Sequence, residues 1–354
     1  MYNISYAIKI PIDFAIMGST ESNPDCTIDN ASTQTLFSLK DRTIIVTGAT
    51  GGLGSQITRA ILESGGDVIG IDRDEIPPAA IWGEHTAQFL PSPSARTKQR
   101  PAYTHAHARA HAPLLNTEPL QTLAKSFSCR LTYRPCDITS QSLTATVFEE
   151  AASDARYPLR GLVNCAGIGM VGDSIDYSED LTKRTLDVNL AGSLYVAQAA
   201  AKVVRRQHQE GSSQGGASFV LVASMSGYIT NKQSRHHHRS NRIFAQATPT
   251  AIYSASKAGV HQLTRSLAGE WGSSASPSAP TIRVNSISPG VIQTPMTKDV
   301  LSRQDWASVW EQEAMLKRIS RPEEYRGAVV FLLGDASSYV TGVDLRVDGG
   351  STAW

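Results

Sequence analysis

Tyr253 and Lys257 lie four residues apart in the stretch YSASK, so on a helix they share one face. A free tyrosine has a pKa of about 10 and is a poor acid–base group at neutral pH. A lysine cation beside it favours the phenolate and moves that pKa toward the working range. The pair predicts proton transfer to or from an alcohol or carbonyl, although such spacing alone also occurs in ordinary surface pairs.

Two further polar residues could complete such a site. Ser224 ends the apolar run ASFVLVAS, where its hydroxyl could bond a substrate oxygen. Asn189 lies in TLDVNLAGS, inside a predicted helix, and could hold a water that links Lys257 to solvent. Singly, these are a strand-end serine and a solvent-facing asparagine. Together with Tyr253 and Lys257, and with the glycine loop described next, they favour an active site.

The stretch TGATGGLG (47–54) follows an apolar run and precedes a helical pattern. Glycines in that context let the backbone turn tightly and approach a pyrophosphate, whose charge then faces the next helix N-terminus. The alternative is an ordinary glycine-rich turn between a strand and a helix. We expect nucleotide contacts at Gly48, Thr50, Gly52, Leu53 and Gly54.

Asp72 ends the second apolar run, 24 residues after Gly48. A carboxylate there accepts both ribose hydroxyls of an adenosine and repels a 2′-phosphate, which favours NAD. Arg73 follows it and could bind that phosphate, so NADP stays open. Asp72 could also simply cap a turn.

Two more strand ends carry candidate cofactor contacts, because ligands of open α/β sheets bind at the carboxyl ends of the strands. We assign Asp137 and Ile138 to the adenine edge. We assign the turn NCAG, with Asn164, Ala166 and Gly167, to the ribose side. Asp137 could instead be the N-cap of a helix over 141–153.

Seven apolar, β-rich segments alternate with helical patterns from residue 43 onward. Such alternation predicts one doubly wound α/β (Rossmann) domain, with a seven-stranded parallel sheet and helices on both faces. The strand segments are 43–48, 67–72, 130–138, 160–167, 217–224, 281–290 and 343–350, and the predicted helices are 55–66, 141–153, 178–205, 254–271 and 322–334.

The domain is expected over 37–354, after a poorly ordered extension over 1–36. Two low-complexity insertions, 74–121 and 230–250, interrupt the alternation and are expected to leave the rim of the sheet as surface excursions. One hypothesis is that both are intron-derived. The second separates Ser224 from Tyr253, so it must loop outward if their geometry is to hold. Its run SRHHHRSN is not predicted to be a metal site, because adjacent histidines point in different directions.

Composition excludes several functions. Lys and Arg number 33 against 32 Asp and Glu, so no nucleic-acid footprint or attraction to acidic membranes is expected. The four cysteines show no CxxC pair, which indicates a reducing compartment. The first residues lack a signal-peptide pattern, and no apolar run is long enough for a membrane span. We therefore expect a soluble, cytoplasmic protein with no membrane or nucleic-acid partner.

The motifs TGATGGLG, NCAG, Asn189, Ser224, YSASK and SPGVIQT, in this order, resemble the short-chain dehydrogenase/reductase family from about Phe37 to Trp354. The C-terminal stretch is most similar to fungal D-arabinitol dehydrogenases and sorbose or xylulose reductases.

The resemblance implies a role for each motif. Tyr253 is the acid/base, Lys257 lowers its pKa and binds the nicotinamide ribose, Ser224 orients the substrate, and Asn189 supports a proton relay. It implies nicotinamide contacts at Pro289, Gly290, Val291 and Thr294, a mobile substrate lid over 295–315, and a homotetramer or homodimer.

The expected activity is an NAD(P)-dependent oxidation of an alcohol or reduction of a ketone, with a polyol or sugar as substrate. A ketone of secondary metabolism is the alternative substrate. A catalytically impaired nucleotide-binding sensor or scaffold is the alternative of another class.

Overall fold

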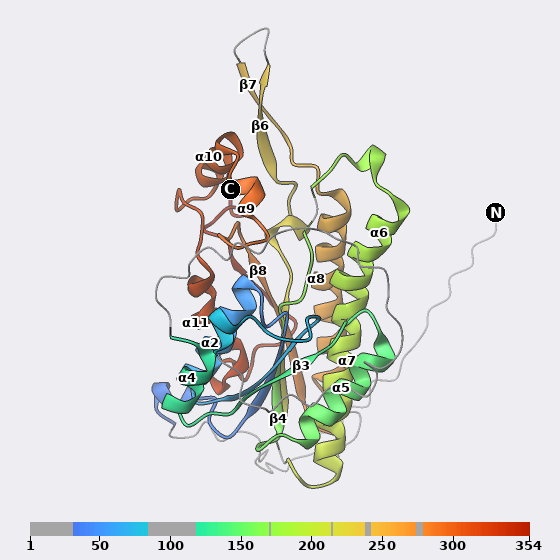
Figure 1. Ribbon diagram of the computed structural model, residues 1–354, viewed down its shortest axis with the longest axis vertical. Helices are drawn as coiled ribbons and strands as arrows, with labels where there is room; N and C mark the ends of the chain where they lie inside the picture. The colour runs from blue at the N-terminus through green and yellow to red at the C-terminus, as the bar shows by residue number, and fades with distance from the viewer. Residues whose placement is uncertain (1–30, 84–117, 170, 214, 238–241, 274–278) are drawn as a thin grey trace, which may run out of the picture.

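The computed structural model describes residues 31–83, 118–169, 171–213, 215–237, 242–273 and 279–354. Seven parallel strands form one sheet in the order β3-β2-β1-β4-β5-β8-β9 (Figure 1), as predicted for a doubly wound fold. The strands are β1 (Thr43–Thr47), β2 (Asp67–Asp72), β3 (Leu131–Pro135), β4 (Leu159–Asn164), β5 (Ala217–Val222), β8 (Ile282–Pro289) and β9 (Asp344–Val347).

The central strands are buried on both faces, which is why they read as continuous apolar runs. All five residues of β1 are buried. Thr47, the last residue of β1, pairs with Ile71 on one side and Asn164 on the other. The carboxyl ends of β1, β2 and β4 therefore meet at one edge, and the loops that follow them lie side by side.

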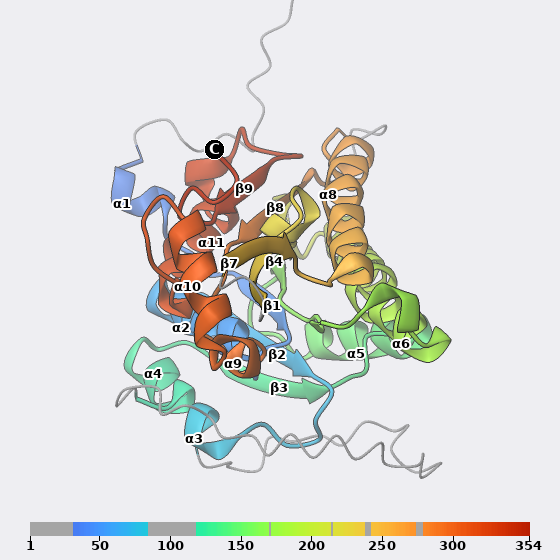
Figure 2. The same ribbon diagram turned by 90° about the horizontal axis from the view of Figure 1, so that it is seen from above.

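Helices cover both faces of the sheet (Figure 2). One apolar cluster packs under α5, α7 and α8, around Phe148, Val196 and Val260. The other packs under α2, α4 and α11, around Ile57 and Val329. These helices are α2 (Gly52–Glu63), α4 (Leu120–Ser126), α5 (Gln141–Ser153), α7 (Gly192–Gln209), α8 (Ala251–Trp271) and α11 (Arg326–Leu333).

The helix predicted over 178–205 is one uninterrupted helical run with an irregular turn in its middle. It consists of α6 (Glu179–Leu186), a π-helical turn over Asp187–Ala191, and α7. Such single π turns often occur at functional sites. This one carries Asn189.

The first insertion contributes to the core where it is described. Its short helix α3 (Ala79–Trp82) places Trp82, 1 % exposed, edge-on against Tyr133 with ring centres 5.3 Å apart. The Trp82 ring lies over Gly70 of β2, where any Cβ would clash with it at 2.2 Å. The rest of this insertion over 84–117, and residues 1–30 of the extension predicted over 1–36, lie outside the described residues. The described end of that extension contains the short helix α1 (Thr33–Leu36).

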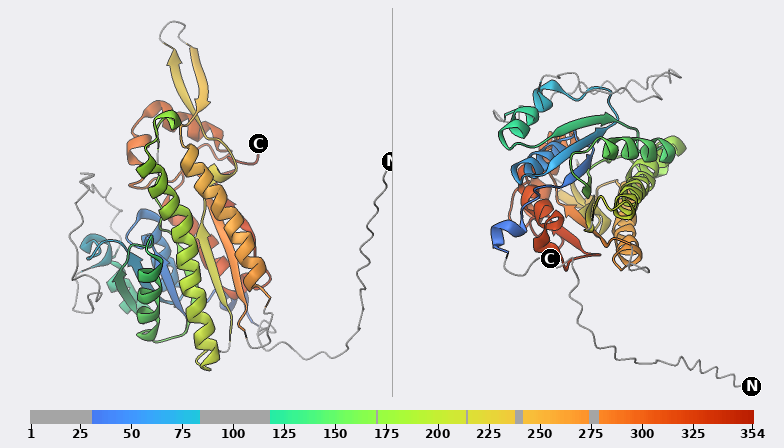
Figure 3. Two further views of the ribbon diagram at one scale, coloured as in Figure 1. Left: turned by 90° about the vertical axis from the view of Figure 1, so that its right-hand side faces the viewer. Right: turned by 90° about the horizontal axis from the view of Figure 1, so that it is seen from below.

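The second insertion forms a β-hairpin rather than an irregular loop. Strands β6 (Lys232–His237) and β7 (Arg242–Ala247) pair antiparallel and rise from the rim of the sheet beside α10 (Figures 1 and 3). The third histidine of the run, His238, lies outside the described residues, and His236 and His237 are described only as backbone of β6. Next to the hairpin, α9 (Lys298–Leu301) and α10 (Gln304–Glu313) cross the same rim.

Candidate active site

Ser224 and Tyr253 meet at the carboxyl edge of the sheet although the hairpin separates them in sequence. Ser224 follows β5, is 8 % exposed, and accepts a hydrogen bond from the Ser226 backbone at 3.2 Å, which fixes its turn. Tyr253 lies in the first turn of α8, and its hydroxyl is hydrogen-bonded to the Ser224 side chain. The insertion thus leaves the serine–tyrosine contact intact.

Lys257 lies one turn further along α8, on the same face, and is 5 % exposed. Its Nζ donates to the Val222 carbonyl at 2.7 Å and lies 6.0 Å from the centre of the Tyr253 ring. Burial lowers the Lys257 pKa to about 8, because desolvation disfavours the ammonium. Near pH 8, Lys257 is therefore present both as the ammonium and as the neutral amine.

The pKa of Tyr253 is raised by burial and lowered by its hydrogen bond to Ser224, and burial prevails. A buried phenolate is costly because the low-dielectric surroundings disfavour the charge. The sequence argument attributed pKa lowering to Lys257. In the structure the hydrogen-bond partner that lowers it is Ser224.

Asn189 is fully buried on its π turn and bridges two elements of the site. Its Oδ1 accepts from the Ile168 backbone at 2.8 Å, and its Nδ2 donates to the Ile168 carbonyl at 3.0 Å. A Cβ on Gly167 would lie 3.4 Å from both Asn189 Oδ1 and Lys257 Nζ. Asn189 and Lys257 therefore flank the NCAG turn, and Asn189 does not face solvent.

The glycine loop forms a cradle closed to side chains. Gly48 has φ +64°, and a Cβ there would lie 2.7 Å from the Cys165 carbonyl carbon and the Ala166 nitrogen. A Cβ on Gly54 would lie 2.1 Å from the Gly48 carbonyl oxygen. The loop leads into the N-terminus of α2, whose free backbone N–H groups favour an anion.

Asp72 holds this loop from the end of β2. Its Oδ2 accepts from the Thr50 backbone at 3.0 Å and from the Thr50 hydroxyl at 2.5 Å, while its Oδ1 accepts from the Arg73 backbone at 2.8 Å. A carboxylate has about four acceptor positions, so one remains for a further donor. The Arg73 guanidinium is turned toward Asp74, with Nε 3.7 Å from its carboxylate.

Asp137 follows β3 and is held in place by its neighbours. Its Oδ1 accepts from the Thr139 backbone and hydroxyl at 3.1 and 2.7 Å, and Arg184 lies 3.6 Å from its Oδ2. Burial alone would raise its pKa, but the bonds from Thr139 and Arg184 prevail and lower it. The N-cap of α5 is Ser140, so the capping role considered for Asp137 belongs to Ser140. Ile138 is buried against Gly192 at the start of α7.

The NCAG turn is anchored from below by Asn164. Its Oδ1 accepts from the Thr47 hydroxyl at 2.5 Å, and its Nδ2 donates to Ser193 at 2.8 Å, so it ties β1, β4 and α7 together. This side chain is 1 % exposed and positions the turn from inside the core. The Ala166 backbone faces Gly48 across the cradle.

The loop after β8 closes the other side of the site. Pro289 ends β8, and the Gly290 backbone donates to the Val347 carbonyl at 3.0 Å. Val291 accepts from the Ser320 backbone at 3.1 Å. A Cβ on Gly52 would lie 3.1 Å from Thr294, so this loop abuts the glycine loop. The segment predicted as a lid then continues into α9 and α10.

Ser256 and Asn231 are site residues that the sequence argument did not single out. Ser256 Oγ accepts from Asn189 Nδ2 at 3.0 Å and donates to the Tyr253 carbonyl at 2.6 Å. Its place three residues after Tyr253 was a usable signal, because that spacing keeps a helical face. Asn231 donates to Ser226 at 2.7 Å, and its position in an insertion concealed it.

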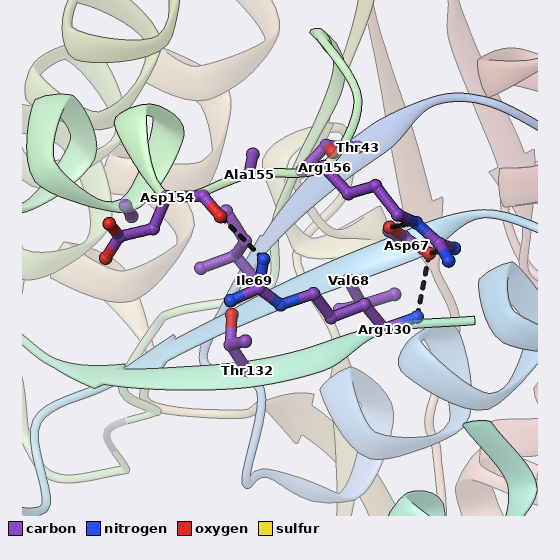
Figure 4. A pocket seen from close by; sticks show the side chains of 10 residues that line it. Thr43, Asp67, Val68, Ile69, Arg130, Thr132, Asp154, Ala155 and Arg156 are labelled. Carbon is purple, nitrogen blue, oxygen red and sulfur yellow. Dashed lines mark hydrogen bonds and ion pairs between the residues drawn. The ribbon is translucent and has the colours of Figure 1, made fainter. Parts of the chain in front are cut away.

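The opposite end of the strands carries a small cavity of about 10 Å³, the lower limit for one water molecule (Figure 4). Asp67 is paired with Arg156 there through two bonds of 2.7 and 3.0 Å, and it also accepts from the Arg130 backbone at 2.7 Å. The Arg130 side chain donates to the Asp154 carbonyl at 2.7 Å. These charges hold β2, β3 and the end of α5 together, far from the catalytic groups.

Among the described residues, no group of three or more His, Cys, Asp and Glu side chains could hold a metal ion. No helix in the described part of the chain is long and apolar enough to cross a membrane.

Comparison with known proteins places the chain among dehydrogenases and reductases. The family model described as "Enoyl-(Acyl carrier protein) reductase" matches residues 106–352. The chain is 38% identical over 334 residues to "Short chain dehydrogenases/reductase notP'" of Aspergillus versicolor, covering 94% of this chain and 95% of that protein. It is 34% identical over 313 residues to "NADH-dependent L-xylulose reductase" of Ambrosiozyma monospora, covering 88% and 94%.

A solved structure has the same fold. It is a short-chain type dehydrogenase/reductase from Mycobacterium marinum, with a TM-score of 0.66 and 27% sequence identity. The match covers 91% of this chain and all of the other.

Proposed function

The chain belongs to the short-chain dehydrogenase/reductase family and is an NAD(P)-dependent oxidoreductase; we propose that it interconverts a polyol and a keto sugar, with Tyr253 as general acid/base. The observation that carries the catalytic assignment is the convergence of Ser224, Tyr253, Lys257 and Asn189 at one edge of the sheet beside the glycine loop.

The residues present fit a dinucleotide. The cradle around Gly48 leaves no room for a Cβ, so its backbone can approach a pyrophosphate at the N-terminus of α2. Asp72 retains an acceptor position for a ribose hydroxyl. Gly52 and Leu53 on α2, together with Asp137 and Ile138, would hold the adenosine half, and Ala166, Gly167, Pro289, Gly290, Val291 and Thr294 would enclose the nicotinamide half.

In the proposed chemistry each side chain has one task. A bound nicotinamide would accept or supply the hydride. Ser224 orients the substrate oxygen by a hydrogen bond. The Tyr253 phenolate takes that oxygen's proton during oxidation, and the Tyr253 hydroxyl returns a proton to it during reduction. Lys257, whose pKa is near neutral, favours the phenolate when charged. Asn189 holds the NCAG turn against Lys257 and supports proton exchange with solvent.

We propose NAD as the preferred cofactor. The Asp72 carboxylate is fixed by Thr50 at the place where a 2′-phosphate would bring a second negative charge. Arg73, which would offset that charge, is turned toward Asp74. The printed name of the Ambrosiozyma relative, an NADH-dependent reductase, supports the same choice.

A polyol substrate is supported by that relative, which is named for L-xylulose. The test is nicotinamide absorbance with NAD and with NADP, using arabinitol, xylitol, sorbitol and mannitol against a panel of hydrophobic alcohols. We expect turnover with polyols and a loss of at least about 100-fold in Tyr253→Phe, which keeps the ring but not the proton. Unchanged activity in Tyr253→Phe would refute the mechanism.

An apolar ketone is the second candidate. Met296 packs on Gly169, where a Cβ would meet its side chain at 3.2 Å, and half of Met296 is exposed at this edge. Turnover of hydrophobic alcohols in place of polyols would favour it. Cofactor binding without turnover on either panel would favour a sensor or scaffold. The resemblance also supports a homotetramer or homodimer, and light scattering would measure the assembly.

A further inference from the structure

We propose that the base of the hairpin β6–β7 ties the lid helix α10 to the Ser224 turn, through the adjacent residues Asn231 and Lys232. Asn231 and Lys232 are then positioning residues for catalysis. The proposal rests on the proposed function, because it takes α10 as part of the substrate lid and Ser224 as the residue that orients the substrate.

Asn231 makes the contact with the catalytic side. Its Nδ2 donates to the Ser226 hydroxyl at 2.7 Å, and both residues are more than nine-tenths buried. The Ser226 backbone in turn donates to the Ser224 hydroxyl at 3.2 Å. Without the Asn231 bond, the buried Ser226 hydroxyl loses its donor, and Ser226 is the residue whose backbone holds Ser224.

Lys232 makes the contact with the lid. Its backbone carbonyl accepts from Trp310 Nε1 at 2.7 Å, and its Nζ lies 2.9 Å from the Glu313 carboxylate. Trp310 and Glu313 are three residues apart, so both contacts use one face of α10. The ion pair is largely exposed and contributes little by itself. The Trp310 bond is therefore the main tie.

These two contacts cannot move independently, because they come from consecutive residues of the chain: Asn231 directly precedes β6, and Lys232 is its first residue. The Thr248 backbone donates to the Asn231 carbonyl at 2.7 Å and closes the hairpin base. The two strands of the hairpin then continue in register away from the rim (Figure 3). Displacement of α10 would pull on Lys232, and through Asn231 on the turn that holds Ser224.

Trp354 offers a matched control. Its indole Nε1 donates to the Glu313 carbonyl at 2.6 Å, so it also fixes α10 by an indole–carbonyl bond. It approaches from the C-terminus of the chain and contacts Glu313 and Lys317, neither of which belongs to the hairpin. Trp310→Phe and Trp354→Phe thus remove the same kind of bond from α10, and only the first breaks the tie.

The experiment is a double-mutant cycle with Asn231→Ala. Removing one hydrogen bond corresponds to about a fivefold change, so we expect Trp310→Phe to raise KM about fivefold and Asn231→Ala to lower mainly kcat. Their combined loss in kcat/KM should be at least about threefold smaller than the product of the single losses, the signature of coupled residues. In the control cycle of Trp354→Phe with Asn231→Ala, the two losses in kcat/KM should multiply. Asn231→Gln keeps an amide N–H that can donate to the Ser226 hydroxyl and should restore much of kcat.

A second readout needs no turnover. Lys298 and Arg303 are exposed at either end of α9, so trypsin reports how firmly the lid is held. Cleavage after these two residues should be faster in Trp310→Phe and in Asn231→Ala. In the double variant the increase in cleavage rate should be smaller than the product of the two single increases. Unchanged cleavage, or multiplicative effects in the Trp310 cycle, would overturn the tie. A wild-type chain without turnover would refute the proposed function, and the cleavage cycle would still decide the tie.

Discussion

Lys257→Met should abolish activity and at the same time stabilise the protein. Burial lowers the Lys257 pKa from 10.5 to about 8. That difference of about 2.5 pH units means that keeping the ammonium in the folded state costs about 3 kcal/mol at pH 7. Methionine has a similar length and no charge. It gives up the 2.7 Å bond to the Val222 carbonyl, worth about 1 kcal/mol, so the net gain is about 2 kcal/mol.

The sign of the pH dependence follows from the same pKa. Below pH 8 both folded and unfolded chains carry the Lys257 proton, so the full cost is present. Between pH 8 and 10.5 the unfolded chain binds the proton and the folded chain does not, so wild-type stability rises with pH by about 1.4 kcal/mol per unit. At pH 9.5 most of this cost is gone, and the stability advantage of the variant nearly disappears.

Urea unfolding of the cofactor-free wild type and Lys257→Met at pH 7 and pH 9.5 measures this difference, and other titrating groups cancel in the comparison. The same two proteins are assayed for turnover. A variant that is less stable than wild type at pH 7, or an advantage that does not shrink toward pH 9.5, would refute the reasoning. Full activity in the variant would refute the catalytic role.

Three further predictions test the cofactor site and the core beneath it. Gly48→Ala should lower the free energy of unfolding by about 3 kcal/mol and abolish cofactor binding, because its Cβ would clash at 2.7 Å at a position with positive φ. Gly211 is the control, since it has φ +73° and nothing within 4 Å of an added Cβ. Gly211→Ala should therefore lower the free energy of unfolding by only about 1 kcal/mol in the same urea titration. Asp72→Ser should shift the ratio of kcat/KM toward NADP by about 100-fold, since the repulsion of the 2′-phosphate disappears; an unchanged ratio would contradict our placement of the ribose. Burial lowers the pKa of His261, so the folded chain resists its protonation and stability should fall as pH drops below about 6.5. His261→Gln should flatten that loss in unfolding curves between pH 7 and 5.

The sheet was predictable because its strands are buried on both faces. The ranges 67–72 for β2 and 141–153 for α5 agree with the structure to the residue. The helix predicted over 55–66 corresponds to α2, which spans Gly52–Glu63. The predicted range therefore begins three residues too late and ends three residues too late. The glycine loop itself supplies the first turn of α2, and apolar periodicity cannot show a turn that is built from glycine.

The residues of the proposed catalytic set were predicted from their types and order, and the structure brings them together, but their hydrogen bonds were not predictable. The π turn at Asn189 adds a residue to one turn of the helix and so points this side chain at Ile168, which a regular 3.6-residue period does not indicate. Ser224 and Tyr253 were paired by type and order alone. The Asn164 side chain bonds Thr47 and Ser193 inside the core. This arrangement depends on how β1, β4 and α7 pack together, which the sequence pattern does not indicate.

The hairpin shows why a long insertion between two catalytic residues need not separate them. An antiparallel pair returns the chain to its starting point, because its two strands lie about 5 Å apart along their whole length. Here the bond between the Thr248 backbone and the Asn231 carbonyl closes the excursion at its base, and Tyr253 follows only five residues later, in the first turn of α8. Length added beyond that bond does not change where Tyr253 lies relative to Ser224. An insertion without paired strands would not bring the chain back to its starting point, and the contact between the Ser224 and Tyr253 hydroxyls would be lost.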